Sequence, residues 1–131
     1  MPETMTIGRV AKAAGVNVET IRYYQRRGLI GEPRKPLGGH RRYSTAVLRQ
    51  INFIRRAQQL GFTLEEIGRL LELSDGRPCR EARLIAEKRF TVIESRIAEL
   101  ERMRGELGSL IDACRKAGRG TCPLIEDLNR E

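Results

Sequence analysis

Three cysteines, at positions 79, 114 and 122, are the residues of this chain best suited to bind a metal. Thiolates are soft ligands that select soft metal ions and discriminate against magnesium, calcium and manganese. The chain holds a single histidine, so other metal-binding nitrogen ligands are scarce. Cys79, Cys114 and Cys122 are therefore the candidate ligands of a soft-metal site.

The spacing of these cysteines argues against a site made by one chain. Residues 80–114 are predicted to form one helix, and at ~1.5 Å rise per residue Cys79 and Cys114 would lie roughly 50 Å apart. If two such helices run antiparallel, Cys79 of one subunit comes beside Cys114 and Cys122 of the other, and a dimer holds two thiolate sites. A parallel dimer would keep them apart.

The same segment carries a heptad pattern, which predicts a coiled coil. The a positions hold Phe90, Ile97, Arg104 and Ile111. The d positions hold Ala86, Ile93, Leu100, Leu107 and Cys114. Glutamates fall at e (Glu87, Glu94 and Glu101) and arginines at g (Arg89 and Arg96), a pattern that by itself favours a parallel pair. Exposed e/g pairs contribute only ~0.2–1 kcal/mol each, so the geometry of the ligands and the family resemblance given below outweigh them.

The amino-terminal residues predict a helix-turn-helix. Thr6 and Asn17 can cap two short helices that run to Ala14 and Arg27, with a tight turn at Gly15 and a stop at Gly28. The expected core consists of Ile7, Val10, Ala11, Ala14, Val16, Ile21 and Tyr24. The side chains left to face a DNA groove are Glu19, Thr20, Arg22, Tyr23 and Arg26.

Residues 31–43 contain two prolines and three glycines, which predicts a hairpin or wing. A flexible basic loop can follow a DNA backbone, so its basic side chains are expected to contact phosphates. They are Lys35, His40, Arg41 and Arg42. Two more helices follow, one beginning at Ser44 and ending at Gly61, and one beginning with the capping box of Thr63 and Glu66. Their apolar positions start with Val47, Leu48, Ile51, Phe53 and Ile54, and Arg55 is a further candidate for phosphate contact.

Charge divides the chain in the same way. The net charge is +8, yet residues 1–60 hold 12 Lys and Arg against 3 acids, whereas residues 61–131 hold 13 against 14. A basic front half is expected of a module that contacts phosphates, and a balanced rear half suits a helix that pairs with a protein. The Gly and Pro of residues 75–78 predict a boundary between a DNA-binding domain, 1–75, and a dimerisation helix with a metal-binding loop, 76–131.

Other classes of protein fit less well. The chain has no apolar run long enough to span a membrane and no visible secretory signal, so we expect a cytoplasmic protein. An odd number of cysteines in such a compartment argues against a disulfide framework. There is no Ser/His/Asp set and no Gly-rich phosphate loop, so we expect no enzyme. A DNA-architectural protein that uses its coiled coil only to dimerise remains an alternative.

Three segments carry a resemblance to a known family: TIGRVAKAAGVNVETIRYYQRRGLI, GGHRRYS and RAQQLGFTLEEIGRLLEL. Together they resemble the MerR family of bacterial transcriptional regulators, and the remaining DGRPCREA, long helix and ACRKAGRGTCPLIEDL are similar to its mercury-responsive branch. The resemblance implies a mainly α fold: a winged helix-turn-helix, an antiparallel coiled coil joining two subunits, then a metal-binding loop and a short helix. It also implies a homodimer that binds operator DNA within a promoter. Such a dimer represses without metal, and with metal bound it distorts the DNA so that RNA polymerase can engage.

The resemblance further implies that Hg(II) is the inducer, held by Cys79 of one subunit and by Cys114 and Cys122 of its partner. The loop between Cys114 and Cys122 has seven residues, about one fewer than the mercury branch leads us to expect. Relatives that sense Pb(II) or Cd(II) also use three cysteines, so these ions are the alternatives. Zinc-sensing relatives place a histidine in the loop, and residues 115–121 contain none. A disulfide switch between Cys114 and Cys122 is the chemical rival.

Overall fold

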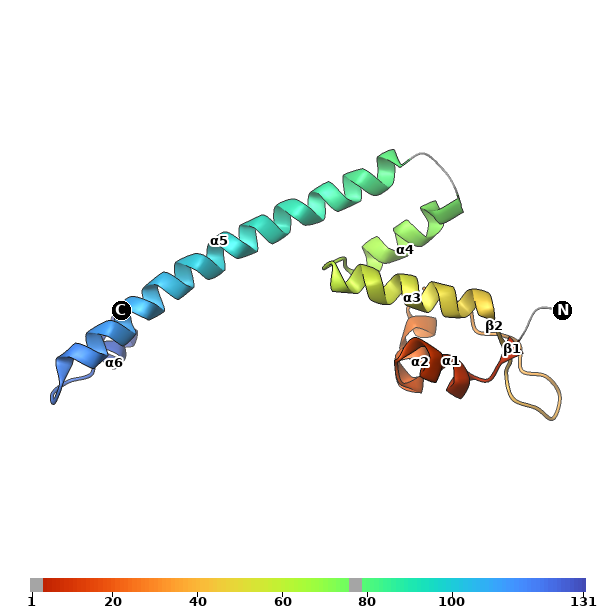
Figure 1. Cartoon of the computed structure of the whole chain (residues 1–131), viewed down its shortest axis with the longest axis horizontal. Helices are drawn as coiled ribbons and strands as arrows, with labels where there is room; N and C mark the ends of the chain where they lie inside the picture. The colour runs from red at the N-terminus through yellow and green to blue at the C-terminus, as the bar shows by residue number, and fades with distance from the viewer. Residues whose placement is uncertain (1–3, 76–78) are drawn as a thin grey trace. The chain divides into compact units, whose positions relative to one another are not determined.

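The structure is a computed structural model that describes residues 4–75 and 79–131. Its fold is mainly helical, as predicted (Figure 1). The elements are β1 (Thr4–Met5), α1 (Ile7–Ala14), α2 (Val18–Arg26), β2 (Tyr43–Ser44), α3 (Thr45–Gln59), α4 (Leu64–Glu72), a 3₁₀ turn η1 (Leu73–Asp75), α5 (Arg80–Ala117) and α6 (Pro123–Leu128).

The ends of the short helices follow their capping residues. The Thr6 side chain accepts a hydrogen bond from the N–H of Arg9 at 3.3 Å, and Asn17 accepts one from the N–H of Thr20 at 2.8 Å. Gly15 ends α1 with a φ of 70°, a backbone conformation that favours glycine. The predicted capping box at Thr63 and Glu66 is also formed, at the start of α4. Local sequence signals therefore set these helix boundaries.

The wing differs in detail from the prediction. Residues 31–42 contain no strand, so they form a loop instead of a hairpin. The loop is closed at its base by β2, which pairs antiparallel with β1 from before the first helix, Thr4 opposite Ser44 and Met5 opposite Tyr43. Pro33 and Pro36 lack the N–H groups that a strand ladder needs, which explains why the loop itself carries no ladder.

One hydrophobic core joins the first four helices and β2. Five of the seven core residues expected for the helix-turn-helix are buried, and Ile7 and Val16 pack against them partly buried. Of the apolar positions noted in the sequence of α3, Ile51 and Ile54 are buried, whereas Phe53 is 37% exposed because it lies on the other face of the helix. The buried residues that the sequence pattern did not single out are Ile30, Tyr43, Ala57 and Ile67.

The chain divides by its contacts into two units, Met1–Arg89 and Phe90–Glu131. The first unit therefore includes residues 80–89 of α5. The boundary predicted at residues 75–78 falls on a segment of which residues 76–78 lie outside the described residues. No helix in the described parts of the chain is long and apolar enough to cross a membrane.

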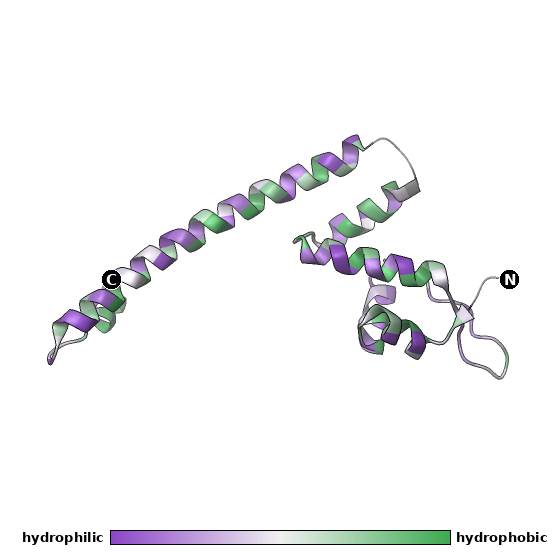
Figure 2. Cartoon of the chain, viewed as in Figure 1, coloured by the Kyte–Doolittle hydropathy of each residue, from purple (hydrophilic) through white to green (hydrophobic). Residues whose placement is uncertain are grey.

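The long helix α5 spans 38 residues, and none of its described side chains is buried. Hydrophobic and hydrophilic residues alternate along its ribbon (Figure 2). The exposed apolar residues at heptad positions a and d, which we call the seam, are Phe90, Ile93, Ile97, Leu100, Leu107 and Ile111. A row of this kind matches the predicted coiled-coil surface.

Candidate metal centre and nucleic-acid interface

Two of the three cysteines lie together in the second unit. Cys114 is in the last turns of α5, and Cys122 directly precedes α6 as its N-cap residue. Their Sγ atoms are 3.6 Å apart, and neither is in a disulfide. The chain between them reverses direction through Gly118 and Gly120, which have φ values of 60° and 155° that other residues rarely adopt. Cys114 and Cys122 of one chain therefore form a dithiol without any contribution from a second chain.

The environment of Cys122 favours its thiolate form. The backbone N–H of Ile125, in the first turn of α6, and then the thiol of Cys114 hold the pKa of Cys122 below its ordinary value. Cys122 is exposed, while Cys114 is half-buried. A thiolate is the form that binds metals, so the lowered pKa makes Cys122 a better ligand for a soft cation than an ordinary thiol.

Cys79 lies in the first unit, directly before α5. Its carbonyl oxygen accepts a hydrogen bond from the N–H of Arg83 at 2.8 Å, so it belongs to the start of the helix, and its thiol is exposed. Within residues 4–75 and 79–131, no three His, Cys, Asp or Glu side chains of this one chain gather to hold a metal ion. The structure thus brings together two of the three predicted ligands, and the third begins the helix at whose far end they lie.

The side chains proposed to read DNA occupy the exposed face of α2. Glu19 and Arg22 form an ion pair at 3.0 Å, with 70% and 55% of their side chains exposed. Thr20 is half-buried, and its hydroxyl donates to Asn17 at 2.9 Å, so it also completes the cap. Tyr23 is exposed, and the guanidinium groups of Arg26 and Arg27 each lie 5.9 Å from the centre of its ring. Contact of Glu19, Thr20, Arg22 and Tyr23 with DNA remains a prediction.

A surface groove of about 420 Å³ separates α2 from the wing loop. Basic and polar side chains line it from both sides: Arg22, Gln25 and Arg26 from α2, and Lys35, His40 and Arg41 from the loop. Gln25 donates to the hydroxyl of Tyr43 at 2.9 Å, which ties α2 to β2. No local sequence pattern indicates the role of Gln25, because its contact partner Tyr43 lies 18 positions away in the sequence.

Two further basic residues occupy different surroundings. Arg42 is an exposed residue of the wing loop. Arg55, on α3, is half-buried and donates from Nη1 to the carbonyl oxygen of Ala14 at the end of α1. Gly15 permits this approach, since a Cβ there would lie 3.3 Å from the guanidinium. Arg55 therefore has a structural role in joining α1 to α3, and its contact with phosphate stays a prediction.

The chain is similar to known regulators over nearly its whole length. The family profile described as "MerR HTH family regulatory protein" matches residues 5–74, and the profile "MerR, DNA binding" matches residues 48–110. The mercuric resistance operon regulatory protein of Shigella flexneri is 49% identical over 130 residues, which cover 98% of this chain and 90% of that protein.

Two solved structures share the fold. The transcription regulator PbrR691 from Ralstonia metallidurans in complex with lead(II) has a TM-score of 0.81 at 31% identity, covering 95% of this chain and 98% of that one. The dual function transcriptional regulator MerR from Bacillus megaterium in complex with mercury(II) ion has a TM-score of 0.72 at 35% identity, covering 96% of this chain and 100% of that one.

Proposed function

The chain belongs to the MerR family of helix-turn-helix regulatory proteins, which are transcription regulators and not enzymes, and from this premise we propose that it is a mercury(II)-responsive regulator. The observation that carries the proposal is the pair of thiols 3.6 Å apart, Cys114 and Cys122. It occurs in a chain that is 49% identical to a mercuric resistance regulator. Such a regulator works in the cytoplasm, where the bacterial promoter lies.

In the proposed site, Cys114 and Cys122 of one subunit bind the ion together with Cys79 of the partner subunit, so that a homodimer carries two sites. The uncovered seam on α5 supports the dimer, because a row of apolar side chains at heptad spacing needs a partner helix. An antiparallel pairing brings the start of one α5 to the end of the other. Three thiolates suit a soft cation such as mercury(II).

The proposed partner is promoter DNA, bound through the recognition face of α2 and the basic wing loop. Each module contributes Arg22, Tyr23, Lys35, His40, Arg41 and Arg42, together with Glu19, Thr20 and Arg55. Without metal the dimer represses; with mercury(II) it distorts the operator so that RNA polymerase can engage. Metal ligation supplies the difference in binding free energy that such a shift between two conformers requires.

Mixed dimers test where the ligands come from. A homodimer of the Cys79→Ser variant should not activate transcription in response to mercury(II). The same is expected of a homodimer of the double variant Cys114→Ser/Cys122→Ser. A heterodimer of the two variants keeps one site intact, with Cys79 from one subunit and both other thiols from its partner. In a titration against excess competing thiol, we expect this heterodimer to hold one mercury(II) ion at a site of three thiolates, and we expect neither homodimer to form such a site. A heterodimer that binds none would contradict the shared site.

Lead(II) is the second candidate inducer, because a similar fold with a TM-score of 0.81 is known in complex with it. Titration with mercuric, lead, cadmium and zinc ions, with in vitro transcription recorded in parallel, separates the possibilities. Selective activation by mercury(II) is the expected result. Activation by lead or cadmium would keep the site and change its ion. A response to peroxide with none to metal would indicate a Cys114–Cys122 disulfide switch.

A further inference from the structure

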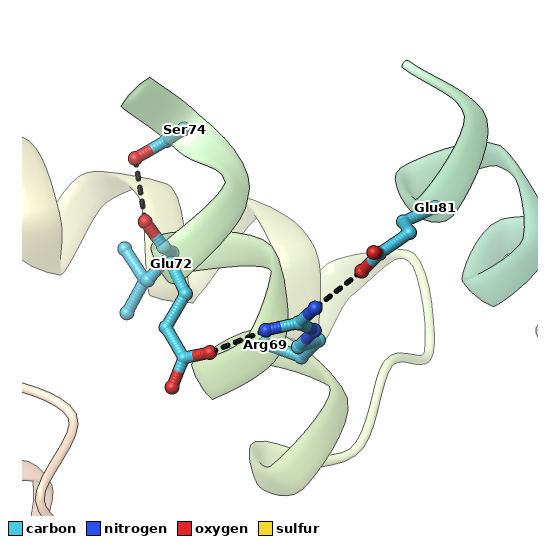
Figure 3. Close-up of polar contacts among 5 residues, drawn as sticks. Arg69, Glu72, Ser74 and Glu81 are labelled. Atoms are coloured by element: carbon cyan, nitrogen blue, oxygen red, sulfur yellow. Dashed lines mark hydrogen bonds and ion pairs between the residues drawn. The ribbon is translucent and has the colours of Figure 1, made fainter. Parts of the chain in front are cut away.

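Residues on either side of Cys79 connect α4 to the first turns of α5, and the guanidinium of Arg69 is at the centre of the connection. On α4, Arg69 binds Glu72 through Nη1 at 2.7 Å, and through Nη2 it binds Glu81, which lies in the first turn of α5 (Figure 3). Both acidic partners hold the pKa of Arg69 above its ordinary value. Glu81 is two residues from Cys79 in the sequence. We call the Arg69–Glu81 pair the latch.

A second pair joins the same two helices further along α5. Arg89 donates to Oε1 of Glu66 from Nε at 3.0 Å and from Nη2 at 2.9 Å. Glu66 also accepts from the N–H of Thr63 at 2.8 Å, so one carboxylate caps α4 and holds α5. We call the Arg89–Glu66 pair the anchor.

The two pairs differ in burial. In the anchor, 19% of the Arg89 side chain and 16% of the Glu66 side chain are exposed, whereas in the latch the values are 43% for Arg69 and 55% for Glu81. Water screens an exposed ion pair, so breaking it costs little free energy. Removing one member of a shielded pair costs more, because it leaves the other charge buried without a partner. The anchor is therefore the firmer of the two connections and serves as the pivot, and the latch is the weaker connection, which couples the start of α5 to α4 while its ion pair is formed.

A movement of α4 reaches the recognition helix through the core. Ile67 of α4 is fully buried in the cluster that also contains Ile21 and Tyr24 of α2. Leu64 and Leu71 pack against the same cluster, and Gly68 faces Leu29, whose Cδ2 would lie 3.5 Å from a Cβ at that position. A close-packed core transmits a displacement instead of absorbing it. A displacement of α4 through Arg69 therefore displaces α2 as well.

We infer that Arg69 and Glu81 are positioning residues through which metal capture at Cys79 is passed to α4 and the recognition helix. This inference rests on the proposed function, because it assigns to Cys79 the role of ligand. Capture by the partner subunit's thiols displaces the start of α5 about the anchor. The latch turns that displacement into a movement of α4.

The test uses full-length dimers carrying Glu81→Gln, Arg69→Gln or both. We measure three quantities for each: the mercury(II) stoichiometry, the operator affinity without metal, and the ratio of transcription with metal to transcription without it. The first two should stay at the wild-type values, since neither residue is a ligand or a DNA contact. The ratio should fall by about two- to fivefold in each single variant, the scale of one exposed ion pair.

The double variant should respond no worse than either single variant, because both changes remove the same contact. Arg69→Lys, which keeps the charge, should recover part of the ratio. Arg102→Gln is the matched control, since Arg102 forms an exposed pair with Glu106 at 3.7 Å within α5 that does not reach α4. It should leave all three quantities unchanged.

An unchanged transcription ratio in Glu81→Gln would overturn the inference, and so would a ratio that falls only in proportion to lost metal binding. Failure of the proposed function looks different. In that case the wild-type dimer itself would show no response to mercury(II), and no comparison among the variants would arise.

Discussion

Arg41 has two partners inside its own loop. Its Nη2 forms an ion pair with Glu32 at 3.0 Å, and its Nε donates to the carbonyl oxygen of Pro33 at 3.1 Å. These contacts hold the side chain at the edge of the groove beside α2. Because the pair with Glu32 is about half exposed, a phosphate can replace the carboxylate at small cost. We interpret Arg41 as an oriented phosphate ligand.

Arg41→Ala should therefore weaken operator binding and make it less sensitive to salt. Loss of one phosphate contact is expected to reduce the slope of log affinity against log salt concentration by roughly one unit. Fluorescence anisotropy with operator DNA at several salt concentrations measures this slope. Arg130→Ala serves as the control, because Arg130 pairs with Asp127 near α6. An unchanged slope in Arg41→Ala would remove Arg41 from the DNA contacts.

At the scale of single elements, helix ends were predictable and long-range pairs were not. Thr6, Asn17 and Thr63 each cap the helix predicted for them, because a cap depends on residues three positions away. Of the two alternatives for residues 31–43, a hairpin or a wing, the hairpin is wrong, because composition does not indicate that β2 pairs with a strand before the first helix. The latch joins residues that are 12 positions apart and lie on two helices, so no local sequence pattern predicts it.

The capping box at the start of α4 makes the first unit sensitive to acid. Burial alone would raise the pKa of Glu66, but the N–H of Thr63 and the guanidinium of Arg89 outweigh it and hold the pKa below its ordinary value. A carboxyl group with a lowered pKa stabilises the fold above its ordinary pKa. That contribution is lost as the pH falls through the folded-state value.

Glu66→Gln should lower the free energy of unfolding by about 1–2 kcal/mol at pH 7. The difference from wild type should shrink as the pH falls below the ordinary glutamate pKa of about 4.3. Urea denaturation followed by circular dichroism at pH 7, 5 and 3.5 measures it. Glu65→Gln, an exposed neighbour in the same turn, is the control and should have little effect. A difference that is constant with pH would rule out the charge of Glu66 as its cause.

At the scale of the whole molecule, the sequence predicts the apolar seam on α5 and the cysteines of the dithiol. It does not predict how a second chain would be oriented against that seam. The heptad pattern predicted a surface on α5, and the structure leaves that surface uncovered in the single chain. The predicted ligands Cys114 and Cys122 are close because a loop with two glycines of positive φ brings them together. In the proposed site, the place of Cys79 relative to them depends on a second chain. Periodicity alone does not set the orientation of that chain, since the e/g charges by themselves favour a parallel pair.

Ile97→Glu should convert the proposed dimer to a monomer, because it puts a charge at an a position in the middle of the seam. Ile97 is 50% exposed in the single chain, so the substitution is not expected to disturb the fold of either unit. We expect the dimer dissociation constant to rise by about two orders of magnitude or more. Analytical ultracentrifugation measures it, with Arg102→Gln on the outer face as control. A dimer that persists would place the interface elsewhere.

The uncovered seam also bears on how long an unpaired chain survives in the cell. A helix of 38 residues without a single buried side chain is exposed to proteases and chaperones until a partner covers it. In the proposed dimer, pairing of two chains is second order in concentration, so it competes less well with proteolysis of the single chain when few chains are present. If the proposed dimer is the working form, the amount of working regulator follows the number of pairs formed and not the number of chains made.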